Sequence, residues 1–176
     1  DYLGEQLEDN DDLAVVVAQH LLDAIDASSS DDVDAEELRA RAVLLLRRAA
    51  SRATALGAQG EALRLLTTAL ARTDDTQLVA ELELAAARAA SDSAQYDKAE
   101  AHGRAAESLF IGLGDEPSAG LAATLVGEAL ISTGDNAAAV ALCEQWLERL
   151  DGRADAVHAR VRLGNLLAGC SPGQAD

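Results

Sequence analysis

The chain of 176 residues is a succession of apolar runs with helical spacing, separated by short polar or glycine-containing turns. Apolar residues recur three and four positions apart, and no run keeps the two-residue alternation of a half-buried strand. This pattern predicts an all-α fold. It places eight helices at about residues 13–26, 34–56, 60–72, 77–90, 95–113, 116–133, 136–150 and 154–167.

Turn residues between the apolar runs support these boundaries. Gly114-Asp115-Glu116-Pro117 ends one helix with glycine, caps the next with aspartate and puts proline in the first turn, where its missing N–H costs nothing. Gly57 and Asp151-Gly152 mark two further helix ends. We also expect Ser91-Asp92-Ser93 to cap the helix that follows it.

A seven-residue phrase recurs in three of the turn-plus-helix units. Its copies end at Ala62, Ala99 and Ala139, which lie 37 and 40 residues apart. A second phrase, Gly127-Glu128-Ala129-Leu130, returns 37 positions later as Gly164-Asn165-Leu166-Leu167. Such self-similarity predicts stacked helix pairs. The units are about 34–74, 75–114, 115–152 and a partial 153–168, with an acidic helix and loop at 1–33 and a flexible tail at 169–176.

The placement of small residues resembles the tetratricopeptide repeat. Small residues on the first helices fall at Ala50, Ala87, Gly127 and Gly164, those opening the second helices at Ala62, Ala99 and Ala139, and the later small positions at Ala69 and Ala106. The resemblance implies a right-handed superhelical stack of antiparallel helix pairs, an α-solenoid, because small residues let two helices approach closely. Trp146 departs from the pattern, which implies either looser packing there or a tryptophan that covers an edge.

Repeats of this longer spacing are similar to the C-terminal arms of bacterial signalling ATPases, including cyclase-linked proteins and LuxR-type regulators. The phrase at 13–24, followed by the Glu-Glu-Leu-Arg-Ala-Arg segment at 36–41, resembles the junction between ATPase and repeats in that group. The chain begins at Asp1 and contains no Met. We therefore expect it to be a piece of a larger protein.

The same resemblance implies a binding surface on the concave wall formed by the first helices, where exposed positions hold peptides. Those positions are Arg47, Ser51, Glu81, Arg88, Thr124, Glu128, His158 and Asn165. The set mixes charges and lacks the Lys/Asn clamp for a terminal carboxylate. Arg88 and Glu128 occupy equivalent positions in adjacent units, so a mutual ion pair is as good an interpretation as ligand contact.

The formal charge of -17 restricts the classes of partner that the chain can bind. Nucleic acid and anionic membranes both require a basic face, so neither is expected as a partner. Residues 1–38 hold 13 of the 31 acidic residues and no Lys or Arg. We interpret this excess as serving solubility and helix N-terminal electrostatics.

Catalytic and metal-binding chemistry has little support. The glycines at 112, 114 and 120 are not followed by Gly-Lys-Ser/Thr, so they do not predict a phosphate loop. The three histidines, His20, His102 and His158, lie on different predicted helices without a second ligand at helical spacing. Cys143 falls on an apolar face and Cys170 in the tail, which predicts no disulfide and a reducing, cytoplasmic compartment. We expect no cofactor, no metal and no enzymatic activity.

Two functions remain open. The first is a non-catalytic protein-interaction or sensor module that binds a protein or peptide. The second is an oligomerisation scaffold, because the last predicted helix lacks a partner and carries Val157, Val161, Leu163 and Leu167. Its uncovered face could pair with a second chain, giving a homodimer.

Overall fold

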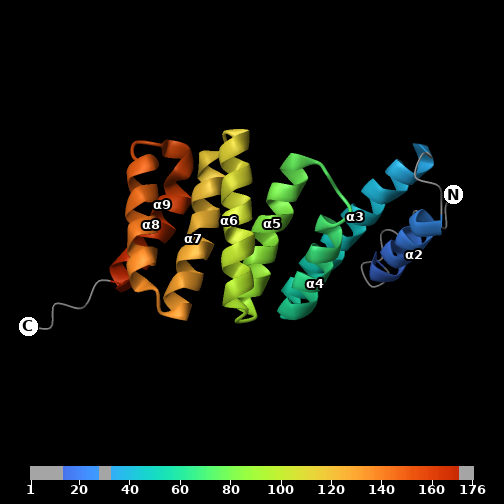
Figure 1. Ribbon diagram of the computed structural model, residues 1–176, viewed down its shortest axis with the longest axis horizontal. Coiled ribbons are helices and arrows are strands. Elements are labelled where there is room, and N and C mark those ends of the chain that lie inside the picture. The colour runs from blue at the N-terminus through green and yellow to red at the C-terminus, as the bar shows by residue number, and fades with distance from the viewer. Residues whose placement is uncertain (1–13, 28–32, 171–176) are drawn as a thin grey trace, which may run out of the picture. The chain divides into compact units, whose positions relative to one another are not determined.

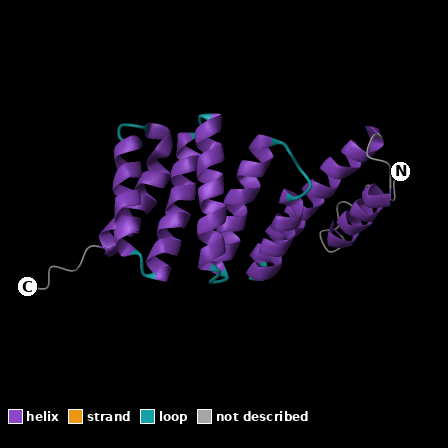
Figure 2. Ribbon diagram, in the orientation of Figure 1, coloured by secondary structure: helices purple, strands orange, loops and turns teal. Residues whose placement is uncertain are grey.

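The computed structural model describes residues 14–27 and 33–170, and within them all regular structure is helical (Figures 1 and 2). The all-α prediction is confirmed, and the helix boundaries agree with the predicted ones to within a few residues. The helices are α2 (Ala14–Ala27), α3 (Val33–Ala55), α4 (Gln59–Leu70), α5 (Thr76–Asp92), α6 (Tyr96–Leu113), α7 (Glu116–Thr133), α8 (Asn136–Arg149), the short 3-10 helix η1 (Ala154–Ala156) and α9 (Val157–Cys170).

The chain divides into two compact units, residues 1–82 and 83–176, and the division falls inside α5. In the first unit α3 packs against both α2 and α4. In the second unit α6 packs against α7, and α7, α8 and α9 all contact one another (Figure 1). Each unit is thus a set of consecutively packed helices, as the repeats predicted. The right-handed superhelix over the whole chain stays a prediction.

Four helix ends share one left-handed turn. A residue one or two positions past the helix end has a positive φ at Gly57, Ala94, Gly114 and Gly134. In each case the next backbone N–H reaches back to a carbonyl five residues earlier, as from Gln95 to Ala90 across 2.8 Å. This is the Schellman arrangement, which satisfies carbonyls that the helix end leaves free. The recurring phrase in the sequence is therefore a recurring turn.

The capping prediction at Ser91-Asp92-Ser93 is wrong. The helix α5 continues through Asp92, and the residue that precedes α6 is Gln95, whose side chain makes no capping hydrogen bond. Aspartates cap the two following helices. Asp115 accepts from the Ser118 N–H and Asp135 from the Ala138 N–H, both across 3.1 Å.

Small residues bring the helices of the second unit close together. The inward faces of α6 and α7 are largely alanine, with Ala99, Ala106, Ala119, Ala122, Ala123 and Ala129 all buried. Two glycines are required by the packing. A Cβ at Gly103 would lie 2.7 Å from Cγ2 of Val126, and one at Gly120 would lie 2.7 Å from Cδ1 of Leu150. Neither position has room for a side chain.

Trp146, which departs from the small-residue pattern, lies beside that second glycine. The Trp146 side chain is 2% exposed, and its Cε3 lies 3.6 Å from where a Cβ of Gly120 would be. The ring is buried against α7, so the interpretation of a tryptophan that covers an exposed edge is wrong. The indole N–H is satisfied by Glu107 of α6.

The C-terminal boundary also differs from the predicted one. Helix α9 extends to Cys170, so residues 169 and 170 belong to the helix and not to a flexible tail. Residues 171–176 lie outside the described residues, as do residues 1–13 and 28–32 of the predicted acidic segment 1–33.

Candidate interaction surface

Three of the predicted groove residues lie in the first unit. Arg47 of α3 and Glu81 of α5 form an ion pair, with 2.9 Å between Nη2 and Oε2. Ser51 donates its hydroxyl to the Arg47 carbonyl one turn earlier in the same helix. The structure therefore brings Arg47 and Glu81 together, and the charge of each side chain is engaged by the other.

Among the groove residues of the second unit, Thr124 cannot contact a ligand. Its side chain is fully buried in α7, and its hydroxyl donates to the Leu121 carbonyl. The sequence resemblance placed Thr124 on the exposed wall. In the structure, α7 is packed against three other helices, so this part of its surface faces inward.

The remaining groove candidates of the second unit differ in their partners and in their exposure. Glu128 of α7 pairs with Arg162 of α9, so the alternative of a mutual Arg88–Glu128 ion pair is wrong. Arg88 is half-buried on α5, whereas His158 and Asn165 are exposed on α9. His158 and Asn165 are therefore the exposed groove candidates of the second unit.

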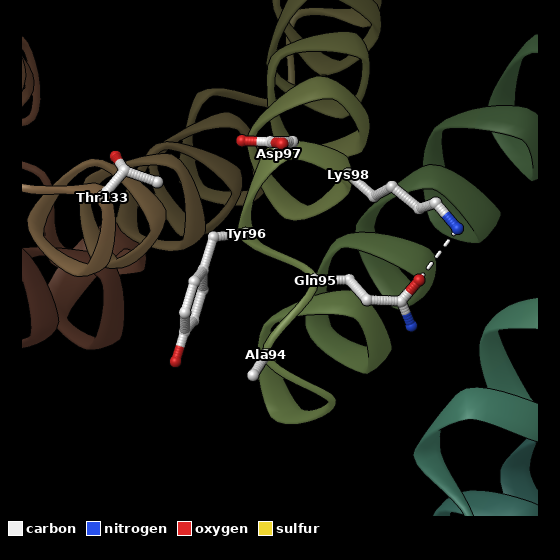
Figure 3. A pocket seen from close by; sticks show the side chains of 6 residues that line it. All are labelled: Ala94, Gln95, Tyr96, Asp97, Lys98 and Thr133. Carbon is white, nitrogen blue, oxygen red and sulfur yellow. Dashed lines mark hydrogen bonds between the residues drawn. The ribbon is translucent and has the colours of Figure 1, made fainter.

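One surface hollow of about 310 Å³ lies beside the turn between α5 and α6. Its lining residues are Ala94, Gln95, Tyr96, Asp97, Lys98 and Thr133. The polar side chains do not converge on a common point: Figure 3 shows Lys98 directed to Gln95, with 2.8 Å between Nζ and Oε1, and away from Tyr96 and Thr133. This arrangement does not orient a small ligand.

A second hollow, of about 320 Å³, lies in the first unit between α3 and the loop that joins α4 to α5. Leu44 and Leu78 contribute its apolar surface, and charges of both signs surround them. The principal polar groups are already engaged. Arg39 pairs with Glu36 across 2.6 Å, and Asp75 accepts from the Leu78 N–H.

A pair that the sequence analysis missed joins α5 to α6. His102 Nδ1 lies 2.6 Å from Glu83 Oε2, and both side chains are largely buried. These residues are nineteen positions apart on different helices, so spacing along the chain gave no signal for the pair. The contact accounts for His102 as a packing residue that links two helices.

The two most exposed large hydrophobic side chains among the described residues of the second unit lie on α9. Val157 and Val161 are 55% and 54% exposed, although both are β-branched hydrophobic residues in a regular helix. Gly164, Asn165 and Ala168 continue the row at intervals of three and four residues, which places them on the same side of the helix. We call this row of five uncharged residues the α9 stripe.

Repeat equivalence shows why this stripe is unusual. Gly127 of α7 and Gly164 of α9 occupy matching positions in the two copies of the second phrase. A Cβ on Gly127 would meet Cδ1 of Leu166 at 3.4 Å and Sγ of Cys143 at 3.7 Å. A Cβ on Gly164 would meet nothing within 4 Å among the described residues. The small residue that is covered by neighbouring helices in α7 is open in α9.

Ion pairs hold α9 in place behind the stripe. Glu116 of α7 binds Arg149 at 3.0 Å and Arg153 at 3.1 Å, which fixes the turn between α8 and α9. Arg162 pairs with Glu128 on the side of α9 that faces α7. The stripe is therefore presented on a helix whose orientation is already set.

Both cysteines contribute to the packing of this end of the unit. Cys143 is buried in α8, and burial raises the pKa of its thiol, as do the nearby charges of Cys170 and Glu144. Cys170 packs against the buried cluster formed by Val126, Leu130 and Ala139. The structural role predicted for Cys143 is confirmed, whereas the placement of Cys170 in a frayed tail is wrong.

Comparison with models of known protein families gives no match, and a comparison with curated proteins finds none of significant similarity. The relationship to tetratricopeptide repeats therefore stays a prediction. Within the described part of the chain, no helix is long and apolar enough to cross a membrane. The described residues also bring together no group of three His, Cys, Asp or Glu side chains that could hold a metal ion.

Proposed function

We propose that this chain is a non-catalytic protein-interaction module whose binding surface is the α9 stripe. In this proposal it is a regulatory arm, of the tetratricopeptide type, within a larger signalling protein. A cytoplasmic location is part of the proposal, and the two free cysteines support it because reduced thiols persist in that compartment.

The observation that carries the proposal is the exposure of the α9 stripe. Two valines more than half exposed in one row leave apolar surface in water, and covering such a side chain stabilises a complex by about 1 to 2 kcal/mol. A row of uncharged residues at Val157, Val161, Gly164 and Ala168 favours a partner that covers it.

The shape of the stripe favours a helical partner. Gly164 and Ala168 are small residues on the same side of α9 as the two valines, so a second helix can approach closely there. Helix-in-groove recognition uses apolar side chains at the same intervals of three and four residues. The partner is therefore an amphipathic helix with apolar side chains along one face.

The concave groove receives less support. Its Arg47 and Glu81 neutralise each other and its Thr124 is buried. The groove thus offers fewer unoccupied groups to a peptide than the resemblance implied.

A photo-crosslinking amino acid placed at residue 161 tests the proposal in cells that produce the protein at its native level. The expected result is a discrete adduct, whose mass identifies the partner. Ala101 is a matched control, because it is exposed on α6 and lies outside the stripe. Absence of an adduct at 161, or the same set of adducts from residue 101, would overturn the proposal.

A further inference from the structure

We infer that the helix covering the α9 stripe is α9 of a second copy of this chain, lying antiparallel about a two-fold axis. The inference deepens the proposed function and rests on it, because it names the partner of the same surface. It follows from the order of large and small residues along α9, from their charge and from the symmetry of a dimer.

The stripe is complementary to itself when it is reversed. If the two-fold axis passes between residues 162 and 163, Val157 of one copy lies opposite Ala168 of the other. Val161 then lies opposite Gly164, where a Cβ would meet nothing within 4 Å among the residues that the structure describes. Each exposed valine therefore faces a small residue, and each pairing occurs twice because the interface is isologous.

A parallel pairing does not have this property. It would set Val161 against Val161 and Gly164 against Gly164, holding the helices apart at one level and leaving a void at the next. It would also align the two helix dipoles in the same direction, whereas the antiparallel pairing opposes them. The order of residues on α9 thus selects one orientation.

Charge permits two copies to meet at this face although the chain carries -17. The stripe itself is uncharged, and the arginines on either side of it have partners within their own chain. Arg160 pairs with Asp151 at 3.3 Å, and Arg162 pairs with Glu128. In the antiparallel register Arg160 lies opposite the neutral Asn165, so no unpaired like charges are brought together.

One helix from each chain gives an interface at the small end of the range for specific complexes. We therefore expect a dissociation constant of about 1 to 100 µM, which makes the dimer dependent on concentration. Sedimentation of the purified chain across that range is the first measurement. A mass that stays at the monomer value up to about 1 mM would overturn the inference.

The variant Val161→Glu places a charge at the centre of the interface in both copies. We expect the dissociation constant to rise at least about tenfold, with unchanged helical circular dichroism because Val161 is exposed. The matched control is Val16→Glu, which makes the same substitution at a valine that is 50% exposed on α2. An unaltered dimer in Val161→Glu, or an equal loss in Val16→Glu, would contradict the assignment to α9.

Disulfide crosslinking between two chains tests the register. In a Cys170→Ser background that retains the buried Cys143, chains carrying Val161→Cys are mixed with chains carrying Gly164→Cys. Mild oxidation is expected to give a higher yield of crosslinked dimer from this mixture than from a mismatched one. The mismatched mixture combines Val157→Cys with Gly164→Cys, and residue 157 is displaced by about 6 Å along the helix from residue 161. Equal yields from the two mixtures would overturn the antiparallel register.

The two proposals can fail separately. A chain that remains monomeric while the crosslinker at residue 161 captures a different protein would overturn the dimer and support the interaction module. A monomeric chain with no adduct at residue 161 would overturn both.

Discussion

The indole Nε1 of Trp146 donates a 2.8 Å hydrogen bond to Oε1 of Glu107, and this bond joins α8 to α6 across thirty-nine residues of chain. The ring lies beside Gly120, and the Arg149 guanidinium is centred 5.0 Å from the ring centroid. A single buried aromatic side chain therefore contacts residues from several helices of the second unit. Substituting this residue should therefore destabilise the packing of several helices in that unit.

We predict that Trp146→Phe lowers the free energy of unfolding by about 1 to 2 kcal/mol, because it removes the hydrogen bond and part of the ring. Trp146→Ala should cost about 3 to 5 kcal/mol, since it also leaves a cavity. Urea denaturation followed by circular dichroism measures both. The control is Glu107→Gln, which keeps an acceptor oxygen for the indole. A large loss in that control would contradict the role assigned to the hydrogen bond.

Two glycine-to-alanine substitutions should have opposite effects. Gly120→Ala brings a Cβ to 2.7 Å from Cδ1 of Leu150 and 3.2 Å from Cβ of Ala159, so we expect a loss of about 1 to 3 kcal/mol. Gly112→Ala meets nothing within 4 Å on the exposed side of α6 and should stabilise the protein by about 0.5 to 1 kcal/mol. Thermal unfolding compares the two. Equal effects would show that helix propensity, and not packing, decides both.

The turn at Ala94 should be improved by glycine. Ala94 has φ 58°, a left-handed conformation that costs an alanine roughly 1 kcal/mol, whereas the equivalent residues of the other turns are glycines. We expect Ala94→Gly to raise the unfolding free energy by about 0.5 to 1 kcal/mol. The reverse change, Gly134→Ala at φ 93°, should lower it by at least as much. Chemical denaturation of the two variants checks the pair, and a destabilised Ala94→Gly would refute it.

The raised pKa of Cys143 predicts a dependence on alkaline pH. The native state holds this thiol neutral, so its contribution to stability is complete below the pH at which an unfolded thiol ionises, about 8.5. The contribution is lost as pH rises from there through the native pKa. Unfolding free energies of the parent chain and of Cys143→Ala, measured between about pH 7 and pH 10, should converge as pH rises. A constant difference would contradict the effect.

The helices were predictable because their signals are local. Apolar spacing sets each helix, and Gly57, Gly114 and Gly134 end three of them in turns that only glycine enters without strain. The error at Ser91-Asp92-Ser93 arose where Ala94 takes the left-handed position. Glycine is the usual mark of such a helix end, and it is missing there.

The interaction surface was less predictable because it depends on contacts between helices. The resemblance placed Thr124 on an exposed wall, but the number of helices around α7 decides its burial. The pairing of Glu128 with Arg162 likewise requires the geometry of α7 against α9. The exposure of Val157 and Val161 was anticipated from the missing partner of the last helix, but Leu163, which was predicted on the same uncovered face, is buried. The contrast between Gly127 and Gly164 became visible only through packing.

The alanine-rich inner faces of α6 and α7 restrict which mutations this unit can accept. Residues such as Ala122 and Ala129 have a single methyl group to lose, so a change to glycine removes little volume. Any larger residue there must push two helices apart, and a displacement of one helix is passed to the next. Substitutions at these alanine positions are therefore confined to the smallest residues.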